Sequence, residues 1–371
     1  MLDSFLTQRL SAIDGVSLDD SQTFADLTTL RVGGAPQVTV VCESAAAAVS
    51  ALRELDATST RYMVVGGGSN LLVSDDPQDI VVVRLAFEDI DVHVAFGLVR
   101  ADAGATWDDV VAMTVDCGLG GIECLSGIPG DAGAVPVQNV GAYGAETSDV
   151  LTQIYLYESA TRSAAWVPAS SLDLSYRYSN LKFTGRGVVL AIELQLTTDG
   201  LSKPLRFGQL TQNPGERRPV ASVRDDVLRL RASKGMVLDP ADHDTWSAGS
   251  FFTNPIVSSS TADVIQSKVR VARGDEDADR MPRHAVPAGS DGEEVKLSAA
   301  WLIERAGFAK GYPGSGPATL STKHTLALTN RGDAKAADIV ALARDIRAGV
   351  LAAFGVELVP EPIWLGVSID E

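Results

Sequence analysis

The segment from Gly127 to Gly144 limits the possible folds of this chain more than any other part of the sequence. It is built of glycine, alanine and other small residues, with Gln138 and Asn139 in its second half. A loop this long inside a compact domain is uncommon and is usually functional. Its small residues leave room for a flat ligand, and the two amides offer donors and acceptors to a heteroaromatic edge. A purely structural Ω-loop is the alternative.

A second glycine-rich segment follows a short apolar run, Tyr62 to Val65. The sequence there is Gly66-Gly67-Gly68-Ser69-Asn70. Several backbone N–H groups with no Cβ beside them can surround a pyrophosphate. Because Leu71 to Val73 continues as a strand, this is not the dinucleotide fingerprint that opens a helix. An ordinary tight turn remains possible for this loop alone, but two such loops favour a large phosphate-bearing cofactor.

Length and charge narrow the class of protein. A chain of 371 residues favours two or three domains. Its net charge of −17 makes nucleic acid an unfavourable partner. We find no pattern of a signal peptide and no apolar run long enough to span a membrane. We therefore expect a cytoplasmic protein without a membrane partner. We also expect a monomer, although neither length nor charge reports the oligomeric state.

The cysteines and histidines do not suggest a metal site or a disulfide framework. Three cysteines lack regular spacing, which predicts reduced thiols. His93, His243 and His284 have no metal-ligand spacing and are interpreted as structural. We therefore predict no metal.

Hydrophobic periodicity predicts mixed α and β structure. The first part is a small α/β unit, residues 86 to about 200 are rich in strands, and the tail is a further α/β unit. The predicted strands are 37–42, 62–65, 71–73, 80–85, 92–96, 98–101, 153–157, 165–167, 188–196, 324–329 and 356–359. The predicted helices are 44–55, 106–117, 223–234, 261–271, 296–306 and a long helix capped by Asp333 and ended by Gly355. The acidic run Gly274 to Arg280 is expected to be a solvated loop.

Seven motifs, in order along nearly the whole chain, resemble the UDP-N-acetylenolpyruvoylglucosamine reductase family, also called UDP-N-acetylmuramate dehydrogenase. The strings GIPGxxGAxxxQNxGAYG and SFFxNP are highly specific. The matching stretches are Thr29 to Gly34, Val64 to Val73, Leu125 to Gly144, Tyr176 to Ser179, Gly249 to Pro255, Lys296 to Glu304 and Pro360 to Pro362.

The resemblance implies an α+β fold. A two-part FAD-binding module of the vanillyl-alcohol-oxidase (PCMH) type would precede an α/β substrate-binding domain. The implied ranges are 1–85 and 86–215 for the two FAD-binding subdomains, 216–355 for the substrate domain and 356–371 for a final strand. Non-covalent FAD and NADPH are the implied cofactors, and a nucleotide sugar the implied substrate. The implied FAD contacts are Gly66, Gly67, Gly68, Ser69, Asn70, Ile128, Pro129, Gly130, Gly133, Ala134, Gln138, Asn139, Gly141, Ala142 and Tyr143.

The family reaction reduces an enolpyruvyl group, so that hydride adds to one carbon and a proton to its neighbour. The resemblance places Arg177, Ser250 and Glu361 in the catalytic roles. Arg177 suits a carboxylate because its guanidinium is a planar, permanently charged fork. Glu361 would help to stabilise the enolate and Ser250 would donate the proton, which requires a dry, preorganised site. We expect these three side chains to meet at the flavin.

Substrate contacts implied by the motifs are Tyr176, Lys234, Asn254, Lys310 and His324. Two positions depart from the family pattern. Phe207 stands where related enzymes with a substrate-covering loop carry tyrosine. Pro362 follows Glu361 and cannot donate a ladder hydrogen bond, which predicts an edge strand or a bulge at this point.

Two other functions remain open at this stage. One is a different oxidoreductase of the same FAD fold, such as an alcohol oxidase. Many of those attach flavin through histidine or cysteine, and neither glycine loop offers one at the expected place. The other is a non-catalytic protein that binds flavin or a nucleotide sugar.

Overall fold

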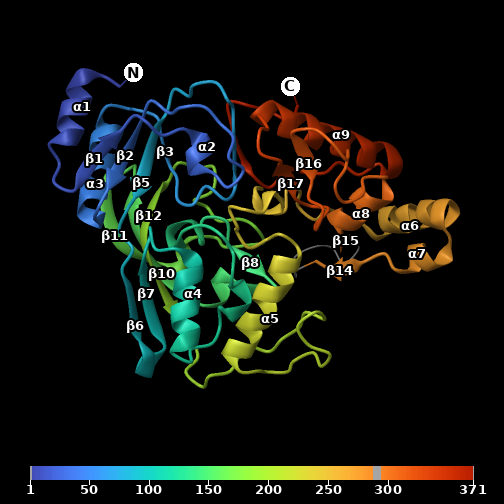
Figure 1. Cartoon of the computed structure of the whole chain (residues 1–371). Helices are drawn as coiled ribbons and strands as arrows, with labels where there is room; N and C mark the ends of the chain where they lie inside the picture. The colour runs from blue at the N-terminus through green and yellow to red at the C-terminus, as the bar shows by residue number, and fades with distance from the viewer. Residues whose placement is uncertain (1, 287–293, 371) are drawn as a thin grey trace. The chain divides into compact units, whose positions relative to one another are not determined.

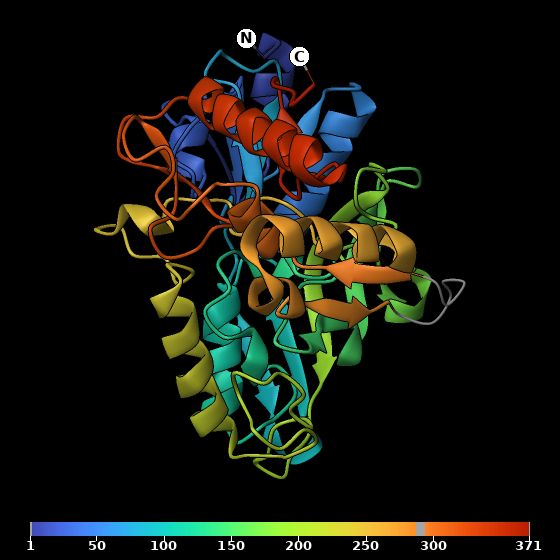
Figure 2. The ribbon, with the colours of Figure 1, turned by 90° about the vertical axis from the view of Figure 1, so that its right-hand side faces the viewer.

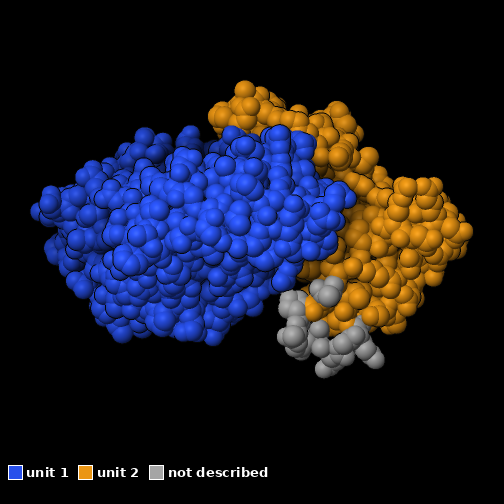
Figure 3. Space-filling model, turned by 90° about the horizontal axis from the view of Figure 1, so that it is seen from below, with its two compact units in different colours: residues 1–27, 35–68, 77–238 blue, residues 28–34, 69–76, 239–371 orange. Residues whose placement is uncertain are grey.

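The computed structural model describes residues 2–286 and 294–370 and has two compact units, which Figure 3 colours separately. Each unit is assembled from segments far apart in the sequence. Unit 1 comprises Met1–Leu27, Ala35–Gly68 and Pro77–Leu238, and unit 2 comprises Thr28–Gly34, Ser69–Asp76 and Asp239–Glu371. These units cut across the four implied domain ranges, which stay a prediction.

The first sheet of unit 1 has four strands in the order β1-β2-β5-β3 (Figure 1). Its strands are β1 (Val16–Asp19), β2 (Val38–Cys42), β3 (Tyr62–Val64) and β5 (Val81–Leu85), with helices α1 (Ser4–Ser11), α2 (Phe24–Leu27) and α3 (Ala45–Ala57). β5 pairs in parallel with both β2 and β3, and β1 is antiparallel to β2. Ser44 caps α3 by accepting a hydrogen bond from the Ala47 N–H. The predicted strand–helix–strand opening is confirmed.

The second sheet of unit 1 has five antiparallel strands in the order β11-β10-β12-β7-β6. They are β6 (Ile90–His93), β7 (Leu98–Asp102), β10 (Leu151–Glu158), β11 (Ser163–Pro168) and β12 (Gly187–Gln195). Helices α4 (Trp107–Asp116) and α5 (Val220–Ser233) cover one face of this sheet, as Figure 1 shows, and share one apolar core with it. The loop from Gly127 to Gly144 contains only a 3₁₀ turn (Ala132–Ala134) and strand β8 (Gly141–Ala142), which pairs with β9 (Ala145–Glu146).

Unit 2 packs helices against three small sheets. The sheets are β13-β15-β14, β16-β17 and the parallel pair β18-β4. The strands are β4 (Leu71–Val73), β13 (Ile256–Ser258), β14 (Arg283–Ala285), β15 (Glu294–Leu297), β16 (Ala318–Leu320), β17 (Leu328–Asn330) and β18 (Ile363–Leu365). The helices are α6 (Ser259–Arg273), α7 (Asp275–Asp279), α8 (Ala299–Arg305) and α9 (Ala336–Phe354). Figure 2 shows α6 beside the strands of the three-stranded sheet.

Several predicted boundaries in unit 2 are wrong. Lys296 lies in β15 because it pairs with Ile256 and His284, and α8 starts only after its cap Ser298. Asp333 does not cap α9. Its N-cap is Lys335, and the Asp338 carboxylate accepts a hydrogen bond from the Lys335 N–H at 2.9 Å.

Three further predictions in unit 2 also fail, wholly or in part. The acidic run predicted to be a loop contains α7, because its acidic first turn suits a helix N-terminus and Arg270 pairs with Asp275. Residues 356–359, predicted to be a strand, have no regular structure, and only the end of the 324–329 prediction lies in β17. Every helix among residues 2–286 and 294–370 is too short or too polar to cross a bilayer.

The apolar face of α9 offers a stability test with a control on the same helix. Leu342 is 7% exposed within the core of unit 2, whereas Leu351 is 47% exposed. We expect Leu342→Ala to lower the free energy of unfolding by about 2–5 kcal/mol, because it removes buried methyl groups and leaves a cavity. Leu351→Ala should lower it by about 0.5 kcal/mol or less. Urea unfolding followed by circular dichroism measures both, and equal losses would contradict this packing.

Candidate active site

The two glycine-rich loops approach each other so closely that side chains are excluded between them. A Cβ on Gly67 would lie 2.9 Å from the Cα of Gly130, and one on Gly66 would lie 2.7 Å from Oδ2 of Asp131. Gly68 has φ +58°, in the left-handed region that favours glycine. The first loop follows the carboxyl end of β3, where open α/β sheets bind ligands.

Backbone hydrogen bonds attach the second glycine loop to strand β7 and the start of α4. Gly133 N–H donates to Ala103 O at 2.9 Å, and a Cβ on Gly133 would lie 2.6 Å from the Ala103 Cβ. Gly130 O accepts from the Trp107 N–H at 2.9 Å. The fold of unit 1 therefore requires a residue without a side chain at Gly133.

Asp108 fixes the beginning of this loop to helix α5. Its carboxylate accepts hydrogen bonds from both terminal nitrogens of Arg224, at 2.7 and 2.9 Å, and from the Gly127 N–H at 2.6 Å. Burial alone would raise the pKa of Asp108, but the hydrogen bonds from Arg224 and Gly127 outweigh it, so the pKa is lowered. The carboxylate stays charged and holds α5 against the loop.

The turn that carries Arg177 lies against the end of the second loop. Arg177 Nη2 donates to Gly141 O at 2.9 Å, and a Cβ on Gly141 would lie 3.4 Å from Nη1. Asn139 reaches the same turn, with its amide donating to Ser175 O at 3.1 Å. Arg177, Asn139 and Tyr143 all have positive φ, between 44° and 57°. Such strain in non-glycine residues persists only where the surroundings impose it, often at functional sites.

Arg231 is a component of the site that the sequence analysis missed. Its Nη2 donates to Met236 O at 2.7 Å, while its buried Nε has no hydrogen-bond partner among the described residues. A Cβ on Gly127 would lie 3.5 Å from this Nε. Burial lowers the pKa of Arg231, and the Tyr143 hydroxyl, which hydrogen-bonds the guanidinium, opposes the shift. No motif marks Arg231, because only the fold brings the last turn of α5 under the glycine loop.

Two other side chains lie against the ring of Tyr143. Phe207 packs edge-on at 5.2 Å between ring centroids, and Lys234 Nζ lies 5.9 Å from the Tyr143 centroid. Lys234 also donates to Gln209 Oε1 at 3.1 Å. Phe207 has no hydroxyl that could bond a ligand. Its ring packs against Tyr143 within unit 1. Tyr176 and Lys234 also belong to unit 1.

In unit 2 the fold brings the backbone of Ser250 and Glu361 onto neighbouring segments. The Glu361 N–H donates to the carbonyl of Phe251, the residue after Ser250, at 2.9 Å. Phe251 N–H donates in turn to Leu326 O at 2.7 Å. Glu361 lies just before β18, so Pro362 precedes the strand ladder and removes no hydrogen bond from it. The predicted meeting of Arg177 with these two residues stays a prediction, because Arg177 belongs to unit 1.

The other predicted contacts of unit 2 lie on loops tied to structural partners. Asn254 Oδ1 accepts a hydrogen bond from the Ala299 N–H at 3.0 Å, at the start of α8. The Lys310 and His324 loops are joined, because Gly311 N–H donates to Ser321 O at 3.1 Å and His324 N–H to Ser321 Oγ at 3.2 Å. Ser69 and Asn70 also belong to unit 2, and Asn70 O accepts from the Ile363 N–H.

A buried carboxylate holds the loop that carries His324. Asp244, only 5% exposed, accepts from the Thr322 N–H at 2.9 Å and from Arg331 Nη1 at 2.9 Å. Burial would raise the pKa of Asp244, but the bonds from Thr322 and Arg331 lower it below its usual 3.8. No cluster that could hold a metal ion occurs within the described ranges.

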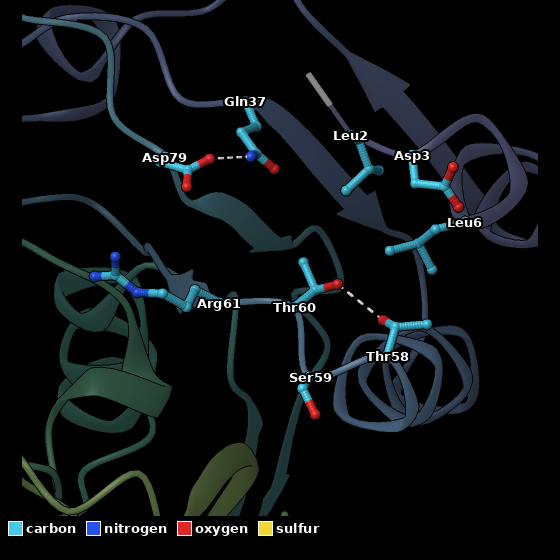
Figure 4. A pocket seen from close by; sticks show the side chains of 9 residues that line it. All are labelled: Leu2, Asp3, Leu6, Gln37, Thr58, Ser59, Thr60, Arg61 and Asp79. Atoms are coloured by element: carbon cyan, nitrogen blue, oxygen red, sulfur yellow. Dashed lines mark hydrogen bonds between the residues drawn. The ribbon is translucent and has the colours of Figure 1, made fainter.

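A hollow of about 480 Å³ lies at the other end of the four-stranded sheet, near the amino ends of β2, β3 and β5 (Figure 4). Gln37 donates to Asp79 across it, and Thr58 bonds Thr60 at 2.8 Å. Arg61, drawn in the same view, forms no ion pair among the described residues. The glycine loops lie instead at the carboxyl ends, so this hollow is not part of the candidate site.

Comparison with known proteins supports the implied organisation. A family model described as "UDP-N-acetylenolpyruvoylglucosamine reductase, C-terminal domain" matches residues 239–365, and one described as "FAD binding domain" matches residues 36–160. A UDP-N-acetylenolpyruvoylglucosamine reductase from Corynebacterium glutamicum (strain R) is 62% identical over 379 residues, covering 100% of both chains. One from Mycolicibacterium smegmatis is 48% identical, covering 97% of this chain and 99% of the relative.

This chain belongs to the UDP-N-acetylenolpyruvoylglucosamine reductase family. The crystal structure of the family enzyme from Thermus caldophilus matches with a TM-score of 0.62 at 25% identity, covering 94% of this chain and 98% of that one. The predicted α+β fold with an FAD-binding module is thereby confirmed. Membership in this reductase family makes the chain a flavoprotein oxidoreductase and decides against an alcohol oxidase.

The residues of unit 1 fit FAD, the cofactor of this family. The first glycine loop offers backbone N–H donors without side chains, the second offers a surface of small residues, and Arg231 offers a buried N–H without a partner among the described residues. Diphosphate oxygens and flavin ring carbonyls are acceptors that match such donors.

Gly67 provides a direct test of the FAD site. We expect Gly67→Ala to lower the flavin content of the purified protein at least tenfold, because its Cβ would collide with the Gly130 backbone. Gly208→Ala is the matched control, since a Cβ there meets nothing within 4 Å. The ratio of flavin to protein absorbance measures both. Full flavin content in Gly67→Ala would contradict the assignment of this loop.

The lowered pKa of Asp244 predicts that this residue contributes to the free energy of unfolding in a pH-dependent way. A carboxylate with a lowered folded-state pKa stabilises the fold above its unfolded pKa, and this stability is lost as pH falls through the folded pKa. Asp244→Asn should therefore lower the free energy of unfolding by about 1–3 kcal/mol at pH 7. The difference should shrink below pH 3.8.

Asp263, 67% exposed and paired with Arg283, is the control for Asp244 in the same unit. Asp263→Asn should cost about 0–1 kcal/mol, as is usual for surface ion pairs. Denaturant unfolding at several pH values measures these differences. A loss at Asp244→Asn no larger than at Asp263→Asn would show that the buried carboxylate does not hold the loop.

Proposed function

We propose that this protein reduces the enolpyruvyl group of UDP-N-acetylglucosamine-enolpyruvate to give UDP-N-acetylmuramate, with FAD as cofactor and NADPH as reductant. The product is a building block of peptidoglycan. The observation that carries this proposal is the 62% identity, over the whole of both chains, to a relative named for this reductase activity. A cytoplasmic location and a monomeric state stay predictions.

FAD supplies a hydride for the substrate after its reduction by NADPH. The protein has to hold the cofactor and the substrate, exclude water and provide a proton. We assign the FAD diphosphate to the N–H groups of Gly66 and Gly67, and the flavin ring to the segment from Ile128 to Tyr143. Arg231 Nε, buried under Gly127, supports a hydrogen bond to a ring carbonyl.

Arg177 would bind the carboxylate of the enolpyruvyl group. Negative charge grows beside this carboxylate when hydride adds, so a fixed cation lowers the energy of the transition state. The bond from Arg177 Nη2 to Gly141 O and the turn with φ +57° hold the guanidinium in one orientation. Because the guanidinium is already oriented, little conformational entropy is lost when it binds the substrate carboxylate.

Ser250 would donate the proton and Glu361 would hydrogen-bond the enolate. A serine hydroxyl is a weak acid and protonates only a strongly basic carbon, which fits the charge that hydride addition creates. Both segments are joined through Phe251, which is fully buried. Movement of either segment is thus resisted by the core of unit 2.

Substrate recognition is assigned to Tyr176, Lys234, Asn254, Lys310 and His324. Lysine suits the diphosphate of a nucleotide sugar because it supplies positive charge in a chain with a net charge of −17, and histidine can supply a ring N–H donor. Asn254 Oδ1 already accepts from Ala299, so its NH₂ group is the part assigned to the ligand.

The two half-reactions separate the role of Ser250 from a structural one. In Ser250→Ala we expect NADPH to bleach the flavin at close to the normal rate, while reoxidation by the enolpyruvyl substrate slows at least a thousandfold. That ratio corresponds to about 4 kcal/mol in the barrier. Stopped-flow absorbance of the flavin measures both steps in the holoenzyme.

Ser267→Ala, at an exposed position on α6, is the control and should leave both half-reactions unchanged. Equal slowing of both steps in Ser250→Ala would contradict the role as proton donor. NADPH consumption that does not depend on the enolpyruvyl substrate would contradict the proposed function as a whole.

A further inference from the structure

Asp131 places a carboxyl group between the two glycine-rich loops, where none of the assigned roles uses it. Its Oδ2 lies 2.7 Å from the position of a Cβ on Gly66, and its Oδ1 lies 3.4 Å from that of Gly67. The Gly67 N–H donates a hydrogen bond to the carboxyl. The side chain therefore bonds one of the backbone donors assigned to the FAD diphosphate.

The charged groups around Asp131 do not neutralise it. Arg84 on β5 is the cation whose charge favours ionisation of the carboxyl, and Glu88 opposes it. Asp131 forms no ion pair within the part of the chain that the structure describes. Burial is the largest influence and, with Glu88, raises the pKa of Asp131 to about 6.

An ionised Asp131 conflicts with a diphosphate on the same loop. FAD brings two negative phosphates to Gly66 and Gly67 if the cofactor assignment above is correct. Like charges at close range and partly shielded from water repel each other, and the favoured relief is protonation of the carboxyl. A protonated carboxyl could also donate a hydrogen bond to a phosphate oxygen, which a carboxylate cannot do.

We propose that Asp131 is a determinant of cofactor affinity, and that FAD binds to this protein together with one proton on the Asp131 carboxyl. The proposal rests on the assigned position of the FAD diphosphate at the first glycine loop. No covalent step is involved, since a proton from solvent is taken up when FAD binds and returns when FAD leaves.

Coupling between FAD binding and protonation of Asp131 predicts how the Kd for FAD depends on pH. Below the pKa of the FAD-free protein, near 6, Asp131 is already protonated and the Kd for FAD is constant. Above it, proton uptake opposes binding, and the Kd rises up to tenfold per pH unit until the pKa of the complex is passed. Retention of the flavin is therefore weakest at alkaline pH.

The experiment measures the release of FAD from the diluted holoprotein between pH 5.5 and 8.5 at constant ionic strength. Bound and free FAD are separated by ultrafiltration, and free FAD is measured by fluorescence. For the unsubstituted protein we expect the Kd to rise at least tenfold over this range. Asp131→Asn and Asp131→Ser remove the charge in two ways, and each should give a Kd that is nearly constant and lower at pH 8.

Two further variants distinguish Asp131 from other titrating groups. Asp102→Asn is the matched control, because the pKa of Asp102 is also raised by burial in unit 1. It should keep the pH dependence of the unsubstituted protein. Glu88→Gln should move the onset of the rise to lower pH, because it removes the neighbouring charge that favours protonation of Asp131.

Three outcomes would overturn the inference. The first is a constant Kd for the unsubstituted protein, and the second is the same pH dependence in both Asp131 variants. The third is weaker FAD binding at pH 8 in folded Asp131→Asn, which would mean that the carboxylate only supports the loop. Failure to retain FAD at any pH would instead overturn the cofactor assignment itself, and this inference with it.

Discussion

The approach of two backbone segments without side chains between them is the constraint on which unit 1 depends. Gly67 lies so close to Gly130 that a single methyl group would separate the loops. Sheet, helix and loop are joined here by backbone hydrogen bonds from Gly130 to Trp107 and from Gly133 to Ala103. The surface that results carries backbone N–H donors and few side chains.

Polar side chains are used in this protein to fix loops rather than to build the cores. Asp108 holds the start of the second glycine loop through Gly127 and Arg224. Asp244 does the same for the loop of His324 through Thr322 and Arg331. Such charge-assisted bonds are directional, so they hold a loop in one geometry where apolar packing would permit several. Each of these two loops is therefore held in one geometry within its own unit.

Local patterns predicted most helices and strands because their causes are local. Runs rich in β-forming residues predicted β10 and β12, and Ser44 with the alanines after it predicted α3. The wrong helix starts in unit 2 arise where two sequence signals for different boundaries lie within a few residues of each other. Periodicity predicts a helix from Lys296, although strand pairing includes this residue in β15. The sequence also predicts a cap at Asp333, although Asp338 stabilises the helix start two residues later, at Lys335. Strand pairing decided the first case and a local capping bond decided the second, and periodicity contains neither kind of information.

The sequence by itself determined the family and the FAD module, and it supplied the segments to which the reaction is assigned, because these depend on motifs that are continuous in the chain. Only the tertiary structure showed that residues 28–34 and 69–76 belong with residues 239–371. Arg231 under Gly127 and Asp131 beside Gly66 could likewise be recognised only in the fold. An isolated arginine or aspartate has no pattern of its own. Its role follows from burial and from the charges around it, and both are properties of the packed structure.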